Sequence, residues 1–197
     1  MTQQLEIEYK NMLTKEEFSY LCTFFKLTDE NFHSQSNHYF DTKDFALKNL
    51  KSGLRIREVQ NRFECTLKEP ATGIGLTETT DLLTKSEVQS ILSGHSVLHA
   101  HEVESRLQAL QIDPHDLLIL GTLYTKRAEI NYKGGLLVFD HSQYADVDDY
   151  ELEYEVSDEE SGKMIFENFL TLHSIPRRPA DKKTARFMSA VNKKRGL

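Results

Sequence analysis

The sequence is poor in cysteine and in long apolar runs. Its two cysteines, Cys22 and Cys65, each lie among apolar residues, with no CxxC pair and no histidine at metal-ligand spacing. We therefore expect both to be buried as small hydrophobic side chains. The longest apolar runs, such as residues 117–120, are four residues long, and residues 1–4 are polar, so the sequence predicts a soluble, cytoplasmic protein.

The sequence also lacks an excess of positive charge. Lysine and arginine number 24 and aspartate and glutamate 31, which gives a formal charge of 24 − 31 = −7. Broad binding to the phosphate backbone of nucleic acid needs the opposite balance. We expect a small-molecule partner, no nucleic acid, no membrane, and a monomer or homodimer.

Sequence motifs of several common sites are missing. Gly73 and Gly75 form a GxG with no helix after it, which excludes a dinucleotide fingerprint and a Walker A loop and predicts a turn. His99 and His101 have no third ligand nearby, which favours a solvated segment over a metal site. The sequence shows no Ser-His-Asp or Cys-His arrangement for nucleophilic catalysis.

Alternating apolar and polar residues predict eight β-strands. They are expected at residues 5–10, 37–41, 54–59, 62–68, 76–81, 122–132, 136–144 and 150–156. Turn residues separate neighbouring strands, at 52–53, 60–61, 73–75 and 133–135. These short turns predict hairpins in an antiparallel meander and disfavour a parallel sheet.

Helical spacing of apolar residues predicts helices between the strands. Capping boxes predict the starts of three, at Thr14 with Glu17, Thr84 with Glu87 and Ser157 with Glu160, the first running over about residues 15–26. Residues 100–110 and 181–194 are also expected to be helical. Since no repeat, low-complexity tract or linker interrupts the pattern, residues 1–197 are expected to form a single domain.

The polar alternates of several strands carry charge of both signs. The residues that share a face within one strand are Arg55 with Arg57, Glu64 with Thr66 and Lys68, and Glu151 with Glu153 and Glu155. If the strands close into a barrel covered by helices, the apolar alternates face the helices and the charged ones line the lumen. The predicted fold class is therefore α+β, an eight-stranded antiparallel β-barrel with helices packed on the outside.

A charged lumen suits a charged ligand, because a buried ion without a partner costs several kcal/mol. A triphosphate carries about four negative charges and needs several cationic donors. A divalent cation such as Mg²⁺ or Mn²⁺ needs a group of carboxylates. The sequence supplies both kinds of side chain on its strands.

The same residues carry a resemblance to a known family. Glu6-Ile7-Glu8-Tyr9-Lys10 matches the ExExK signature of the CYTH superfamily of triphosphate tunnel metalloenzymes, which includes thiamine triphosphatases, inorganic triphosphatases and class IV adenylate cyclases. Further matching segments follow in order: Leu54-Arg55-Ile56-Arg57, Thr66-Leu67-Lys68, Glu78, Lys126-Arg127, Asp140, Glu151-Leu152-Glu153 and Lys182-Lys183. Alone, the first segment also fits a solvated edge strand, and Arg55 and Arg57 also fit surface ion pairs with Glu64. Their common order favours the tunnel.

The resemblance implies roles for these residues. The ligands of Mg²⁺ or Mn²⁺ would be Glu6, Glu8, Glu78, Glu151 and Glu153, with Glu151 and Glu153 preferred over Glu155 on the last strand. The phosphate ligands would be Lys10, Arg55, Arg57, Lys68, Arg127 and Lys183, with Lys182 or Arg186 as alternatives to the last. The catalytic set would be Glu8, Lys10, Arg55 and Arg57. Asp140 would orient Arg127 or a nearby lysine.

The implied activity is metal-dependent hydrolysis of a triphosphate: inorganic triphosphate, thiamine triphosphate or a nucleoside triphosphate. Either a metal-bound water or one carboxylate would act as the base. Two alternatives are a class IV type adenylate cyclase, which converts ATP to cyclic AMP and diphosphate, and a module that binds triphosphate or polyphosphate without turnover. The sequence shows no dedicated adenine pocket, which favours hydrolysis.

Overall fold

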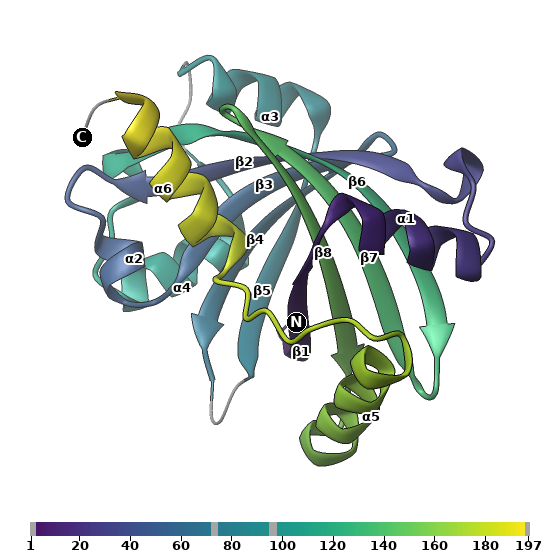
Figure 1. Ribbon diagram of the computed structural model, residues 1–197. Coiled ribbons are helices and arrows are strands. Elements are labelled where there is room, and N and C mark those ends of the chain that lie inside the picture. The colour runs from purple at the N-terminus through teal and green to yellow at the C-terminus, as the bar shows by residue number, and fades with distance from the viewer. Residues whose placement is uncertain (1–2, 72–74, 95–97, 196–197) are drawn as a thin grey trace. The chain divides into compact units, whose positions relative to one another are not determined.

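The computed structural model describes residues 3–71, 75–94 and 98–195, except for the side chains of residues 3–6, 192, 194 and 195. These residues form eight strands and six α-helices (Figure 1). The strands are β1 (Gln3–Leu13), β2 (His33–Thr42), β3 (Gly53–Val59), β4 (Arg62–Pro70), β5 (Leu76–Leu83), β6 (Leu117–Tyr132), β7 (Gly135–Tyr144) and β8 (Val147–Val156). The helices are α1 (Lys15–Phe24), α2 (Ala46–Asn49), α3 (Lys85–Leu92), α4 (His101–Ala109), α5 (Glu159–Leu172) and α6 (Lys183–Arg195).

The strand order is β1-β5-β4-β3-β2-β6-β7-β8, the order of a closed barrel. The strand pairs for which a register is given are antiparallel. The predicted fold class is therefore confirmed, and all eight predicted strands are present. Three begin three or more residues earlier than predicted: β2 includes residues 33–36, β6 includes 117–121 and β8 includes 147–149. Strand pairing continues there through sequence that does not alternate cleanly.

The chain divides into two compact units. The first comprises Met1–Leu5 and Gln35–Leu123, and the second comprises Glu6–Ser34 and Tyr124–Leu197. In each unit, one face of the sheet is apolar and packs on helices, whereas the other face is polar.

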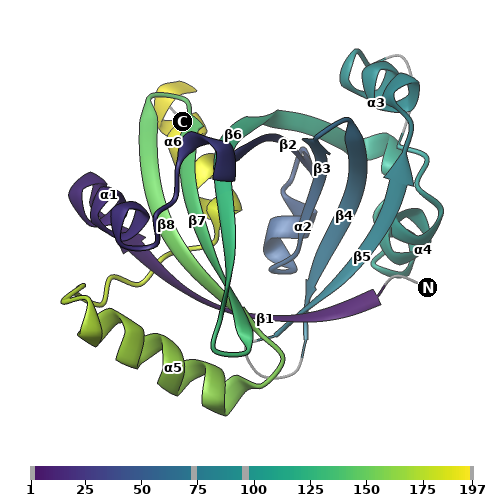
Figure 2. The same ribbon diagram turned by 90° about the vertical axis from the view of Figure 1, so that its right-hand side faces the viewer.

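In the first unit, the apolar face of β3 and β4 packs on α3 and α4. Ile56 and Leu67 are fully buried together with Val88 from α3 and Val103 from α4. The Asp81 carboxylate of β5 accepts hydrogen bonds of 2.9 Å from the backbone N–H groups of residues 102 and 103, so it caps α4 from the sheet. Figure 2 shows α4 beside β5.

In the second unit, the apolar face of β7 and β8 packs on α1 and α5. Phe139 and Leu152 are fully buried against Leu21 of α1 and against Phe166 and Phe169 of α5. Figure 1 shows α1 against this sheet. Because this face is filled by apolar side chains, the alternate residues of β1, β6, β7 and β8 point to the opposite face.

Two of the three predicted capping boxes are confirmed, those at Thr14 and Thr84. The third was wrong. The N-cap of α5 is Asp158 in place of Ser157, and its carboxylate accepts the backbone N–H of Ser161 at 2.9 Å. Strand β8 pairs with β1 through Val156, which delays the start of the helix.

The hairpin between β3 and β4 has the predicted turn. Gln60 and Asn61 both have positive φ, 46° and 65°, as a two-residue hairpin loop requires. The predicted turn at 73–75 lies mostly outside the described residues. Both cysteines are free thiols; Cys65 is buried as predicted, but Cys22 on α1 is only half-buried. Among the described helices, none is long and apolar enough to span a membrane.

Candidate active site

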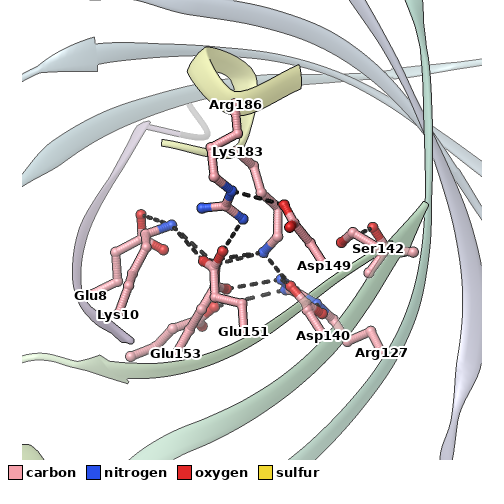
Figure 3. A network of polar contacts seen from close by, with 12 residues as sticks. Glu8, Lys10, Arg127, Asp140, Ser142, Asp149, Glu151, Glu153, Lys183 and Arg186 are labelled. Carbon is pink, nitrogen blue, oxygen red and sulfur yellow. Dashed lines mark hydrogen bonds and ion pairs between the residues drawn. The ribbon is translucent and has the colours of Figure 1, made fainter. Parts of the chain in front are cut away.

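The polar face of the second unit carries a group of eight ionisable side chains, here called the carboxylate–cation cluster. Its members are Glu8, Lys10, Arg127, Asp140, Glu151, Glu153, Lys183 and Arg186 (Figure 3). They come from four neighbouring strands and from the first turn of α6. Strand register brings them together, since Lys10 lies opposite Glu153, and Asp140 lies opposite both Arg127 and Glu151.

Arg127 is held at the centre of the cluster by two carboxylates. Its Nε and Nη2 donate to the two oxygens of Asp140 at 2.8 and 2.6 Å, and Nη2 also donates to Glu153 at 2.9 Å. The predicted contact between Asp140 and Arg127 is therefore present, and its part in any reaction stays a prediction. Burial lowers the pKa of Arg127, but the charges of Asp140 and Glu153 outweigh it, so the pKa lies well above its usual value.

Two lysines also pair with carboxylates of the cluster. Lys10 Nζ lies 2.8 Å from Glu8 and 3.0 Å from Glu153. Lys183 Nζ donates to Asp140. It also donates, at 2.7 Å, to the Glu153 oxygen that Lys10 contacts. Of the two candidate lysines at the start of α6, the preferred Lys183 thus enters the cluster, whereas Lys182 is exposed.

Opposite charges balance within the cluster. Its four cations and four carboxylates give a formal sum of +4 − 4 = 0. Burial raises the pKa of Glu153, but the charges of Lys10, Lys183 and Arg127 outweigh burial and hold that pKa well below its usual value. For Glu151 burial prevails over the attraction of Lys183 and raises the pKa. Glu151 therefore takes up a proton more readily than Glu153.

Three carboxylates at one end of the cluster have the spacing of a metal site. Oxygens of Glu8, Glu153 and Glu155 all lie within 4.8 Å of one another. Glu8 and Glu155 lie opposite each other on β1 and β8. Carboxylate oxygens are the ligands that Mg²⁺ and Mn²⁺ prefer, so this donor set fits the implied metal.

Only some of the predicted metal ligands belong to the three-carboxylate group. Glu8 and Glu153 belong to the three-carboxylate group, but its third member is Glu155, which sequence reasoning ranked behind Glu151. Glu151 instead contacts Arg186 and Lys183. The Glu6 side chain lies outside the described residues, and Glu78 lies in the first unit. The register of β1 against β8 would have identified Glu155, and sequence alone does not give that register.

Arg186 joins the cluster in addition to Lys183, not as its substitute. Its Nε donates to Asp149 at 3.1 Å, its Nη1 donates to the backbone oxygen of Asp181 at 2.6 Å, and its Nη2 donates to Glu151. Asp149 was not predicted as a site residue. The spacing of Lys183 and Arg186, three residues apart on a helix, is the sequence signal that both face one side.

The first unit carries the other predicted site residues on its polar face. Register aligns Lys68 with Glu78, and the two form an ion pair. The Nε of Arg57 donates to the Asn37 side chain at 3.0 Å. The Nε of Arg55 is buried and has no hydrogen-bond acceptor within the part of the chain that the structure describes. A buried guanidinium N–H in this state favours an anionic ligand.

Comparisons with known proteins identify the family of the chain. The family model of the CYTH domain matches residues 4–188. The Bacillus subtilis (strain 168) protein named "Putative triphosphatase YjbK" is 45% identical over 193 residues, which cover 98% of this chain and 99% of that protein. A solved structure from Bacillus halodurans, described as a putative adenylate cyclase, is 40% identical with a TM-score of 0.90 and covers 95% of this chain and 99% of that one.

A more distant solved structure shares the fold alone. It is a Hippeastrum protein described as a putative adenylyl cyclase with a dominant triphosphatase activity, 23% identical, with a TM-score of 0.78 over 94% of this chain and 95% of that one. The match of the family model covers nearly the whole chain, and the Bacillus relatives match along their full lengths. The chain therefore belongs to the CYTH family.

Proposed function

We propose that the protein is a divalent-metal-dependent hydrolase that cleaves a triphosphate substrate to phosphate and a diphosphate. The observation that carries this proposal is the carboxylate–cation cluster, in which Glu8 and Glu153 adjoin lysines and an arginine and, with the neighbouring Glu155, have the spacing of a metal site. Names of relatives support it, since the Bacillus subtilis relative is named for triphosphatase activity.

Charge balance supports the requirement for a metal. The cluster is neutral by itself, so a triphosphate with about four negative charges would leave it strongly negative. A divalent cation held by Glu8, Glu153 and Glu155 would offset much of that excess. When bound, such an ion stabilises charge on phosphate oxygens and acidifies a coordinated water.

The cations of the cluster differ in how they would serve the substrate. Arg127 is fixed by its two-point contact with Asp140, so it provides positive charge at a set place. The ammonium groups of Lys10 and Lys183 lie at the ends of flexible stems and can turn from a carboxylate to a phosphate oxygen. The two lysines are thus proposed to turn toward phosphate oxygens of the substrate, whereas Arg127 stays in position.

The polar face of the first unit supplies further proposed phosphate ligands: Arg55, Arg57 and Lys68. Arg55 has the strongest support, because its Nε is buried without a described acceptor. Glu6 and Glu78 stay predictions as additional metal ligands. We also propose that residues 1–197 act as one domain in the cytoplasm, as a monomer or homodimer.

A second candidate function is that of an adenylate cyclase. The Bacillus halodurans relative is described in those terms. A cyclase would use the same phosphate ligands but would also need to recognise adenine and activate the ribose hydroxyl. The cluster supplies cations for phosphate and carboxylates for a metal ion, the two kinds of side chain that hydrolysis requires.

Product analysis tests the proposal. The purified protein is incubated with tripolyphosphate, thiamine triphosphate or ATP, each with Mg²⁺ or Mn²⁺. We expect orthophosphate; cyclic AMP would show a cyclase, and binding without any product would show a non-catalytic module.

A matched pair of variants ties the activity to the cluster. Arg127→Met removes a cluster cation, whereas Lys126→Met removes the exposed neighbouring cation on the other face of β6. Only the first should abolish orthophosphate release, and equal activities of the two variants would contradict this site.

A further inference from the structure

All three guanidinium nitrogens of Arg186 donate to acceptors of the protein itself. Each of its three nitrogens donates to a different residue: Asp149, Asp181 and Glu151. Only 14% of its side chain is exposed. Since Glu151 is fully buried, movement of Arg186 toward a ligand would remove one of the cations that compensate it. Arg186 is therefore suited to a fixed structural position and not to binding a phosphate.

Tyr144 and Asp149 hold Arg186 from the sheet side. The Tyr144 hydroxyl donates to the same carboxylate oxygen of Asp149 that accepts the Nε of Arg186. The Tyr144 ring is buried and packs edge-on against Phe187, the next residue of α6, with ring centroids 6.0 Å apart. The end of β7 thus contacts two consecutive residues of the helix.

Through helix α6, the contact with Arg186 also fixes the position of Lys183. Lys183 and Arg186 are three residues apart on α6, so they lie on one face about one turn from each other. A helical turn is rigid on this scale, and the position of Arg186 sets where the Lys183 stem begins. Lys183 in turn reaches Asp140 and Glu153.

We propose that Tyr144 and Asp149 are positioning residues, which fix the first turn of α6 through Arg186 and thereby place the Lys183 ammonium in the cluster. Neither residue needs to touch substrate for this role. The part that concerns turnover rests on the proposed function, because Lys183 is assigned there to phosphate.

Hydrogen exchange of α6 tests the positioning role without any substrate. Tyr144→Phe keeps the ring against Phe187 and removes the hydroxyl. Loss of one hydrogen bond to a charged group should speed exchange of the first-turn amides, residues 185 and 186, about tenfold. Core amides of β7 and β8 serve as the reference and should not change.

A matched control lies on the same strand as Asp149. Tyr150→Phe also removes a phenol hydroxyl from an aspartate, because Tyr150 donates to Asp148 at 3.4 Å. Among the described residues, no hydrogen bond or ring contact joins Tyr150 or Asp148 to α6. This variant should leave exchange of α6 unchanged. Wild-type exchange of α6 in Tyr144→Phe, or equal acceleration in both variants, would overturn the proposal.

Kinetics with tripolyphosphate distinguish a positioning role from a general structural one. Tyr144→Phe should raise the KM about tenfold in the wild-type background but not in a Lys183→Met background, since its effect acts through Lys183. Arg186→Lys should behave like Tyr144→Phe, because an ammonium cannot reach three separated acceptors. Losses that multiply in the double variant would overturn the proposal.

The two proposals fail separately. If wild-type protein neither binds nor hydrolyses tripolyphosphate, the proposed function is wrong, and the exchange data still decide the positioning role. If the wild type is active but α6 exchanges normally in Tyr144→Phe, the positioning role alone is wrong.

Discussion

The polar faces of the two units follow the same alternation but differ in how fully their charges are paired. In the second unit, Asp140 and Glu151 are fully buried; Asp140 pairs with two cations of the cluster and Glu151 with three. In the first unit, the ion pair of Lys68 and Glu78 is 21% exposed at each side chain, and the Nε of Arg55 has no described acceptor.

This difference separates two uses of charge. A buried, fully paired network resists the removal of any member, because each loss leaves an uncompensated ion. Removing a half-buried cation that has an N–H group without a described acceptor should cost little stability but should weaken ligand binding. In the second unit the same residues thus stabilise the fold and carry the proposed binding of phosphate and metal. In the first unit these two roles can be separated.

The largest expected effect is on stability. Arg127→Met leaves Asp140 and Glu153 short of a partner and should lower the free energy of unfolding by about 3–5 kcal/mol. Arg55→Met should lower it by less than about 1 kcal/mol. Urea denaturation of both variants measures the difference, and equal losses would remove the distinction between the two faces.

Substitution of Arg55 should have a much larger effect on the KM than on stability. Because the Nε of Arg55 has no acceptor among the described residues and is proposed to bind phosphate, Arg55→Met should raise the KM for tripolyphosphate about tenfold or more, the loss of a charge-assisted hydrogen bond. Lys85→Met, at an exposed position of α3, is the control and should match the wild type. A wild-type KM in Arg55→Met would remove Arg55 from the site.

Metal dependence compares a carboxylate of each unit. Glu8→Gln removes one member of the three-carboxylate group and should raise the Mn²⁺ concentration for half-maximal activity about tenfold or more. Glu78→Gln should change it less, because Glu78 pairs with Lys68. Equal shifts in a Mn²⁺ titration would place Glu78 among the metal ligands.

On the helix-covered faces the two units are alike, and the smallest effect is expected there. Each has one two-point ion pair, Arg106 with Glu69 in the first unit and Arg178 with Glu17 in the second. Glu69→Gln and Glu17→Gln should each cost up to about 1 kcal/mol in urea denaturation. A loss above about 3 kcal/mol from either would show that the pairs are not equivalent.

The Glu17 pair also predicts a pH dependence. The hydrogen bond from Arg178 lowers the pKa of the Glu17 carboxyl from 4.5 in the folded state. The contribution is therefore present above that value and lost as pH falls through the lower folded pKa. As pH falls below 4.5 the wild type should lose slightly more stability than Glu17→Gln, and identical pH profiles would contradict the shift.

Alternation in the sequence was sufficient to predict the polar faces. Lys10 and Glu153 were assigned to the barrel interior because charged and apolar residues alternate on their strands, and Asp140 was assigned through the family resemblance. The three do meet in the second unit. Local signals also predicted the helices that start at the capping boxes of Thr14 and Thr84.

Contacts that depend on strand register or on helix docking could not be predicted. Glu155 joins Glu8 because β1 and β8 pair in one particular register. Arg186 meets Glu151 and Asp149 because of where α6 docks. The cap of α5 was misassigned because two adjacent residues, Ser157 and Asp158, are both good caps, and only the end of β8 pairing decides between them.

The central claim is that the carboxylate–cation cluster releases phosphate from a triphosphate only with a divalent cation bound. The most direct measurement is orthophosphate release from tripolyphosphate by purified protein, first in EDTA and then after addition of excess Mg²⁺ or Mn²⁺. We predict no orthophosphate release in EDTA and full recovery of release after metal is added. Equal rates in both conditions, or no orthophosphate with any metal, would contradict it.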